Sequence, residues 1–309
     1  MRKTSDELKA IMEKNNCSRI WSWSKFNTYH NSPYEYFLKY IIKKKEDRED
    51  CIYAPVGGMC HDILEKLYTK QIRYKDMKEL FEDAWLTAEI SELKFDRNDS
   101  EKNKNISAKY YSNLKHFFSN HKTISYKTVV EQFVTAKIGN NLFQGYIDMM
   151  FKDENGFYNI VDFKTSTVYK NEKAVNEAGQ LVVYAIALNQ IGIPFDKIRI
   201  GWNFLKYVSV ECTQANGKTT TREIERREIG AKLQSSAKMW LKKLGYNPED
   251  YLDEMVLNND ISILPKDVQE KFKMNDCYIY IDVTQDLLTR WTTNIVNTID
   301  EIISKEKEY

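Results

Sequence analysis

The sequence has almost no net charge. Its 46 lysines and arginines are balanced by 45 aspartates and glutamates, which leaves a formal charge of +1 over 309 residues. A protein that binds DNA tightly without sequence preference usually has a basic excess, because neutralising phosphates supplies most of its affinity. The chain therefore has no global basic field, and any binding of nucleic acid must depend on local patches.

The sequence also lacks a long hydrophobic run. It contains no signal peptide and no stretch of about 18 apolar residues, so nothing in it predicts a membrane span. Its hydrophobic content of 42% is enough for a sizeable core. We expect a cytoplasmic protein with no membrane partner. The sequence leaves the oligomeric state open.

Three strands are predicted close together in the middle of the chain. Residues 126–138, 142–151 and 157–164 alternate apolar and polar side chains, and turn-forming residues occupy positions 139–141 and 153–156 between them. Such a pattern is typical of an antiparallel meander, in which strands that follow one another in sequence also pair.

Charged side chains interrupt these strands at places where they could meet. Because side chains alternate faces along a strand, Asp162 and Lys164 should point the same way and Phe163 the opposite way. Asp148 on the preceding strand can lie beside them, and Glu131 on the first strand is a fourth candidate. A buried carboxylate must be paired or bound to a metal. Two carboxylates beside a lysine predict a Mg²⁺ site for phosphodiester hydrolysis, in which the lysine orients water.

Several sequence elements resemble the PD-(D/E)XK nuclease superfamily, and within it the RecB-like exonuclease branch. That branch includes the RecB and AddB nuclease domains, CRISPR-associated RecB-like nucleases and phage exonucleases. The matching elements are Gly57-Gly58 followed by His61, Leu64 and Glu65; Gly145-Tyr146-Ile147-Asp148; Asp162-Phe163-Lys164-Thr165; Gln180 with Tyr184; and an opening segment with Ser24, Tyr29, Pro33 and Tyr36.

The resemblance implies a fold and a division of the chain. The expected fold is α/β, with a restriction-endonuclease-like core whose mixed central sheet is flanked by helices. We expect a single nuclease domain over residues 1–309. Its parts would be a helical N-terminal part carrying the His motif (1–122), a catalytic core (123–206), and a C-terminal hairpin with helices (207–309).

The resemblance also implies roles for the site residues. Asp148 and Asp162 would bind Mg²⁺ or Mn²⁺ together with His61 and the carbonyl of Phe163. An imidazole ligand suits Mn²⁺ better than Mg²⁺. Catalysis would rest on Asp148, Asp162, Lys164 and Glu131.

The helix after the strands is expected to contact DNA. Gln180 and Tyr184 are four residues apart and so share one helix face. Gln180 would contact the nucleic acid or the lysine region, and Tyr184 would do the same or belong to the core. For Glu65, a surface carboxylate is as compatible with the pattern as a site role.

Many members of that branch hold an iron–sulfur cluster with four cysteines, three of them closely spaced after the Gln-x-x-x-Tyr element. In this sequence only Cys212 and Cys277 follow Tyr184, and they lie far apart. We therefore predict no iron–sulfur cluster, and free, mostly buried thiols instead.

The flanking regions contain further predicted elements. Helices are expected over 5–14, from 33 onward, from 57 through His61, and over 77–93 and 107–120, with 96–105 as a flexible loop. Beyond the core we expect strands over 194–206, 208–212, 219–225 and 277–283 and helices over 229–244 and 285–305. A locally basic region over 222–243 could line a DNA path or be a solvated helix face.

The predicted function is a divalent-metal-dependent DNA exonuclease in phage or bacterial DNA recombination, repair or replication, with recombination or replication proteins as partners. If a phage encodes the protein, we expect it in the host cytoplasm. An endonuclease on the same core is one alternative. A catalytically silent nucleic-acid-binding module is the other, since a fold does not by itself imply a function.

Overall fold

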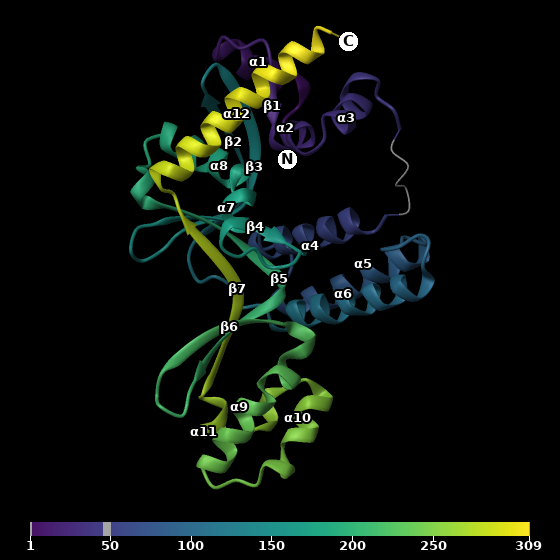
Figure 1. The fold of residues 1–309 in the computed structure, drawn as a ribbon, viewed down its shortest axis with the longest axis vertical. Coiled ribbons are helices and arrows are strands. Elements are labelled where there is room, and N and C mark those ends of the chain that lie inside the picture. Colours follow the sequence, from purple (N-terminus) through teal and green to yellow (C-terminus); the bar gives the residue numbers. More distant parts are fainter. Residues whose placement is uncertain (1, 46–50, 309) are drawn as a thin grey trace.

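A mixed, seven-stranded sheet forms the centre of the molecule in this computed structural model, which describes residues 2–45 and 51–308. Helices cover both faces of the sheet (Figure 1), as the sequence predicted. The strands are β1 (Ile20–Ser22), β2 (Thr128–Ile138), β3 (Asn141–Lys152), β4 (Tyr158–Lys164), β5 (Ile198–Thr213), β6 (Thr219–Glu225) and β7 (Phe272–Asp282).

Two long strands, β3 and β5, each change partner along one edge. The first part of β3 pairs in parallel with β1 up to Gln144, and its last part pairs antiparallel with β4 from Met149 onward. In the same way, β5 pairs with β4 up to Phe204 and with β6 from Tyr207. The opposite edges carry β2 and β7. Between Gln144 and Met149, β3 therefore has no strand partner on this edge.

One face of the sheet is covered by helices from both ends and from the middle of the chain. Here α2 (Trp23–Asn31), α8 (Gly179–Gln190) and α12 (Gln285–Glu306) pack together over the strands. All residues from Leu181 to Leu188 are buried, which explains why α8 is apolar on all sides. The N-terminal α1 (Ser5–Lys14), α3 (Pro33–Tyr36) and α7 (Glu172–Glu177) complete this part.

The other face is covered by α4 (Tyr53–Tyr68), α5 (Met77–Ile90) and α6 (Ser100–Asn120). A third core lies where β5, β6 and β7 extend past the other strands. There α9 (Ile229–Lys243), α10 (Leu252–Asn258) and α11 (Lys266–Gln269) form a separate lobe (Figure 1). The expected boundary at residue 206 falls inside β5, so this strand continues from the middle of the sheet into the lobe.

The prediction of a flexible loop over residues 96–105 was wrong from residue 100 onward. The α6 helix begins at Ser100, because the side chain of Asp99 accepts a hydrogen bond from the Lys102 amide and caps the helix. Asp96 in turn accepts hydrogen bonds from the Asn98 and Asp99 amides. The polar residues that suggested a loop are therefore those of a helix start.

A buried polar network ties α6 to β7. The carboxylate of Asp276 lies 2.6 Å from Nδ1 of His121 and 2.5 Å from Nη2 of Arg226, and all three residues are buried. Arg226 therefore belongs to the core and not to the predicted basic surface. No helix in the described parts of the chain is both long enough and apolar enough to cross a membrane.

Candidate active site

Asp148 lies in the part of β3 between its pairing with β1 and its pairing with β4. Because Met149 pairs with Val161, Asp148 lies opposite Asp162, just past the last residue pair of that ladder. The side chain of Asp148 replaces the next backbone hydrogen bond of the ladder, because its Oδ2 accepts a hydrogen bond of 2.9 Å from the Phe163 amide. The change of partner along β3 thus puts a carboxylate where the backbone of β4 is unpaired.

Asp162 and Lys164 share a face of β4, as the alternation predicted. Nζ of Lys164 lies 2.7 Å from Oδ2 of Asp162, whose side chain is 6% exposed. Burial and the nearby Asp162 carboxylate raise the pKa of Asp148 well above its ordinary value. Although burial lowers the pKa of Lys164, the charge of Asp162 outweighs it, and the net shift is upward. Lys164 is therefore a cation at neutral pH.

His61 reaches the same point from α4, on the other side of the β3–β4 gap. Its Nε2 lies 3.1 Å from the Phe163 carbonyl oxygen, and its Nδ1 lies 3.5 Å from Oδ2 of Asp148. A carbonyl only accepts, so Nε2 carries a hydrogen toward Phe163, and Nδ1 faces the Asp148 carboxylate. When Nδ1 carries no hydrogen, this nitrogen and the carboxylate oxygen offer two lone pairs to one cation.

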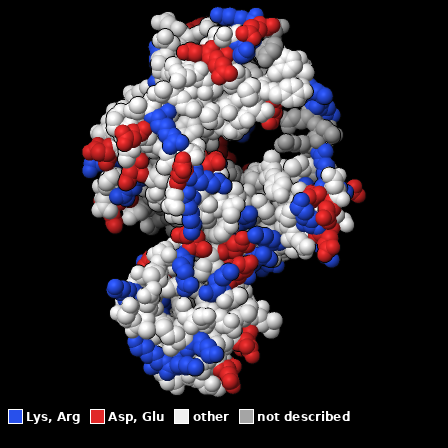
Figure 2. All heavy atoms as spheres, viewed as in Figure 1, with Lys and Arg blue, Asp and Glu red and all other residues white. Residues whose placement is uncertain are grey.

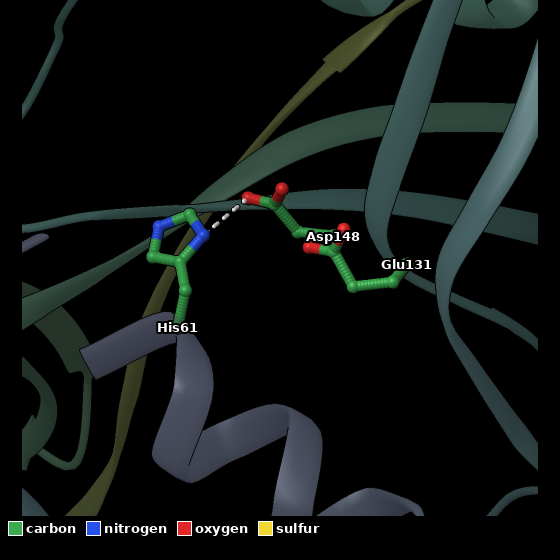
Figure 3. Close-up of side chains that lie close together, drawn as sticks. All are labelled: His61, Glu131 and Asp148. Atoms are coloured by element: carbon green, nitrogen blue, oxygen red, sulfur yellow. Dashed lines mark ion pairs between the residues drawn. The ribbon is translucent and has the colours of Figure 1, made fainter. Parts of the chain in front are cut away.

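Glu131 brings a third side chain to this point from β2. Val130 pairs with Met149 and Gln132 with Ile147, so Glu131 lies opposite Asp148. Its backbone has a φ of 49°, in the left-handed region that residues other than glycine rarely adopt. Strain of this kind is found where the surroundings hold a residue in place, often at functional sites. Figure 3 shows Glu131 and His61 converging on Asp148 from two different elements.

These three side chains have the composition of a metal site. One nitrogen of His61 and one oxygen each of Glu131 and Asp148 lie within 4.8 Å of one another, the one such group found in residues 2–45 and 51–308. Burial and the nearby Glu65 carboxylate raise the pKa of Glu131. A bound cation stabilises the ionised form of such clustered carboxylates. An imidazole with two carboxylates is a ligand set that suits Mg²⁺ or Mn²⁺. The donor set thus fits a divalent metal.

The set differs in part from the predicted one. Glu131, expected in a catalytic role, lies among the converging ligand atoms, whereas Asp162 is paired with Lys164 instead. The carbonyl of Phe163, expected as a ligand, accepts a hydrogen bond from His61 in this arrangement. Glu131, named from the sequence as a fourth candidate, lies opposite Asp148 on β2.

The Gln180 and Tyr184 pair lies on the α8 face next to these carboxylates. Nε2 of Gln180 donates a hydrogen bond of 2.9 Å to the Tyr184 hydroxyl. Burial raises the pKa of Tyr184, and the charges of Asp148, Asp162 and Glu131 raise it further. A Cβ at position 145 would lie 2.5 Å from Cε1 of Tyr184, so Gly145 is needed for the ring to approach β3 this closely.

Two cavities reach the site from different sides. One of about 660 Å³ is lined by Lys164 and Gln180 together with residues of α2 and α12. The other, of about 410 Å³, is lined by His61, Glu131 and Tyr146, and by Arg2 from the N-terminal segment. Sequence reasoning missed Arg2, which lies in no motif, and gave no role to Tyr146, the variable position of the Gly145–Asp148 element. Figure 2 also shows a hollow between the N-terminal helices and α4, and a surface on which acidic and basic residues mix.

All five cysteines are free thiols. Cys60, Cys212 and Cys277 are buried, and Cys17 and Cys51 are partly exposed. Burial raises the pKa of Cys277 to about 12, so this thiol stays protonated and unreactive at neutral pH.

Comparisons with known proteins agree with this arrangement at the level of the family. A family profile described as the PD-(D/E)XK nuclease superfamily matches residues 20–302, and no curated protein sequence matches the chain significantly. One solved structure, titled "Crystal structure of SSO0001", is 12% identical over 65% of this chain and 74% of its own. Its TM-score of 0.20 is too low to support a structural argument.

Proposed function

This chain belongs to the PD-(D/E)XK nuclease superfamily, and within that family we propose that it is a divalent-metal-dependent deoxyribonuclease that degrades DNA from an end. One observation carries the proposal: Asp148, Asp162 and Lys164 meet at the β3–β4 gap, and His61 and Glu131 converge on the same carboxylate. This combination supplies both a hard cation site and a positive charge beside it.

The proposed metal site comprises His61, Glu131 and Asp148, with Asp162 adjoining it. A divalent ion held there would lower the pKa of a bound water and stabilise the leaving oxygen of a phosphodiester. Lys164, charged at neutral pH through its pairing with Asp162, would donate hydrogen bonds to the attacking water or a phosphate oxygen. A cation with no lone pair cannot itself take a proton from that water, so Lys164 orients the reactants and offsets charge.

The proposal favours an exonuclease of the RecB-like branch. Its support is the spacing of Gly145, Ile147 and Asp148, of Asp162 and Lys164, and of Gln180 and Tyr184, which resembles that branch. We place this activity in DNA recombination, repair or replication of a bacterium or phage, in the cytoplasm, with recombination or replication proteins as partners. Mg²⁺ and Mn²⁺ are both proposed to support cleavage.

Two other functions would use the same core. An endonuclease would cut within a strand, and a silent module would bind nucleic acid without cleaving it. The formal net charge of +1 gives no reason to prefer the silent module, because tight non-specific binding usually depends on a basic excess.

The test is digestion of end-labelled linear duplex, single-stranded and closed circular DNA with Mg²⁺ or Mn²⁺. We expect label to be lost from linear DNA alone, and this loss to be abolished in Lys164→Ala. The matched control is Lys152→Ala, because Lys152 is an exposed lysine at the far end of β3. Cutting of the circle would indicate an endonuclease, and binding without cleavage in either metal would indicate the silent module.

A further inference from the structure

A cavity of about 620 Å³ lies in the C-terminal lobe, between the end of the β5–β6 hairpin and α9. Its lining consists mainly of hydroxyl, amide and thiol side chains, and its one cation is Arg222. Among the described residues, no carboxylate and no aromatic ring lines it. A cation surrounded by neutral hydrogen-bonding groups is suited to an anion, because no negative charge in the lining opposes binding.

Arg222 lacks the carboxylate partner that a neighbouring arginine has. Its Nη2 donates hydrogen bonds to Oγ of Ser236 at 3.2 Å and to Sγ of Cys212 at 3.4 Å, and no carboxylate of residues 2–45 and 51–308 forms an ion pair with it. Arg226, by contrast, pairs with Asp276. A guanidinium has five N–H donors, and a phosphate accepts two of them in parallel. Arg222 therefore has donors left for an anion that enters the cavity.

Hydrogen bonds between α9 and the hairpin hold the walls of this cavity in place. Nε1 of Trp240 donates a hydrogen bond of 2.7 Å to the Thr213 carbonyl, and Nζ of Lys243 donates one of 2.8 Å to the Ala215 carbonyl. The same Nζ lies 4.9 Å from the centre of the Trp240 ring. A site whose walls are fixed before a ligand arrives loses less conformational entropy on binding.

The surface around the cavity carries charge of one sign. The end of the hairpin (residues 212–222) and α9 contain no aspartate or glutamate, whereas they contain six exposed basic residues, which are Lys218, Arg222, Lys232, Lys238, Lys242 and Lys243. Of these, Lys232 lies 3.8 Å from Glu228, which precedes α9. Figure 2 shows basic side chains gathered over the far end of the lobe, with acidic ones to one side. These six residues form a local basic patch of the kind that contacts nucleic-acid phosphates.

Strand β5 links this basic patch to the candidate active site. Phe204 pairs with Lys164, and Thr213, which lines the cavity, lies about 30 Å further along β5 at roughly 3.3 Å per residue. Lys170, on the segment that follows β4, forms an ion pair with Glu223 of β6. Because B-DNA rises about 3.4 Å per base pair, 30 Å corresponds to about nine base pairs.

The lining of the cavity favours the backbone of duplex DNA over a single strand. Proteins that bind single strands stack the bases on aromatic side chains. The described lining offers no such ring, and Trp240 beside it is buried. Duplex DNA is stiff over about 150 base pairs, so a duplex bound at the active site holds its phosphates at set distances along its axis. One of these phosphates could therefore meet Arg222.

We propose that Arg222 and the basic patch bind a backbone phosphate of duplex DNA about nine base pairs from the bond that is cleaved. The inference rests on the proposed nuclease function and adds to it an anchoring site outside the active site. The lobe then holds the duplex part of the substrate, while the reacting end lies at Lys164.

The test measures binding separately from cleavage, in the full-length chain carrying Asp148→Asn. Labelled stem-loop DNAs with one open end and stems of about six or about twenty base pairs, roughly 20 and 70 Å long, are titrated by fluorescence anisotropy at about 50 to 200 mM salt. Only the longer stem can reach Lys164 and Arg222 together. Arg222→Gln removes one positive charge and keeps a side chain that can donate to Ser236. Lys75→Gln is the matched control, because Lys75 is an exposed lysine outside the lobe and its charge changes equally.

We expect Arg222→Gln to weaken binding of the longer stem about tenfold, as for the loss of one charge-assisted hydrogen-bonded contact. The slope of log affinity against log salt concentration should fall in magnitude by about one, because one phosphate contact is lost. Affinity for the shorter stem should not change. Lys75→Gln should leave both affinities and the salt slope at the values of the Asp148→Asn background.

An equal effect of Arg222→Gln on both stems, or an unchanged salt slope with the longer stem, would overturn the proposal. An equal loss of affinity for a single strand of about twenty nucleotides would overturn the assignment to duplex DNA. The proposed function fails in a different way, through an unmutated chain that does not cleave DNA in Mg²⁺ or Mn²⁺. Length-dependent binding through Arg222 in such a chain would support the anchoring site and refute the proposed cleavage.

Discussion

Asp148 allows a test in which stability and activity change in opposite directions. Its pKa is raised by burial and by Asp162. A carboxyl group with a raised folded-state pKa stabilises the fold below its unfolded pKa of about 4, and this stabilisation is lost as the pH rises through the folded value. Without a metal, the ionised Asp148 therefore destabilises the protein at neutral and alkaline pH. Asp148→Asn removes this charge at every pH.

The expected gain can be scaled from the same reasoning. Each unit by which the pKa is raised costs about 1.4 kcal/mol once the group is ionised, which for a chain of this size is about 2 °C in Tm. The asparagine oxygen can still accept the hydrogen bond from the Phe163 amide, and its NH₂ group can donate to Nδ1 of His61. We expect the metal-free variant to melt at least about 2 °C above the wild type at pH 8, with the difference shrinking toward pH 4.

Adding metal should reverse this order. A ligand at 100 times its Kd stabilises the folded state by about 2.7 kcal/mol, and the variant should lose most of this gain together with its nuclease activity. Thermal melts at pH 4 to 8, in EDTA and in Mn²⁺, measure both effects. An Asp148→Asn variant that melts below the wild type in EDTA at pH 8, or that gains as much from Mn²⁺, would refute the reasoning.

Asp153 provides the matched control for these melts. Although burial acts to raise the pKa of Asp153, hydrogen bonds from the Asn159 side chain and from two backbone amides lower it overall. A lowered pKa contributes stability above the unfolded value that is lost as the pH falls through the folded one. Asp153→Asn should therefore lower the Tm at neutral pH, and its response to Mn²⁺ should match that of the wild type.

Three further substitutions test other parts of the site. Lys164→Ala should slow cleavage by about 10²–10³-fold in single-turnover assays with an unchanged circular dichroism spectrum, since one charged donor beside the reacting phosphate is lost, and an equal effect of Lys152→Ala would contradict this. Glu131→Gln should weaken Mn²⁺ binding by at least about tenfold in titration calorimetry, and unchanged affinity would remove Glu131 from the proposed ligands. Gly145→Ala should lower the free energy of unfolding by about 1–3 kcal/mol in denaturant titrations, because the added Cβ would overlap the Tyr184 ring unless the ring moved. A variant as stable as the wild type would show that the ring moves aside without cost.

The strand alternation was sufficient to predict part of the site. Asp162 and Lys164 lie on one face of β4, and the short turn between β3 and β4 places Asp148 opposite Asp162. Both follow from local rules, because the period of a strand is two and a short turn fixes the register of a hairpin. Residues that are close in sequence were therefore placed together correctly.

Contacts between distant segments could not be read in this way. Trp23 and Asn294 line one cavity with Lys164, although the three residues come from opposite ends and the middle of the chain. The sequences of α2 and α12 do not predict which element each helix packs against, since an apolar stripe indicates only which face of a helix is buried. The left-handed backbone at Glu131 could not be predicted from the sequence either, because glutamate has no preference for that conformation.

The gap between β3 and β4 links the requirements of the fold to those of the site. Where the ladder ends, the amide and the carbonyl of Phe163 need partners, because buried backbone groups left unpaired are costly. The amide bonds to Asp148 and the carbonyl to His61, so two of the proposed site residues complete the hydrogen bonding of the sheet. This double role fixes the orientation of both side chains before any metal binds. It also explains why Asp148→Asn, which keeps the hydrogen bond and loses the charge, separates the structural role of this residue from its chemical one.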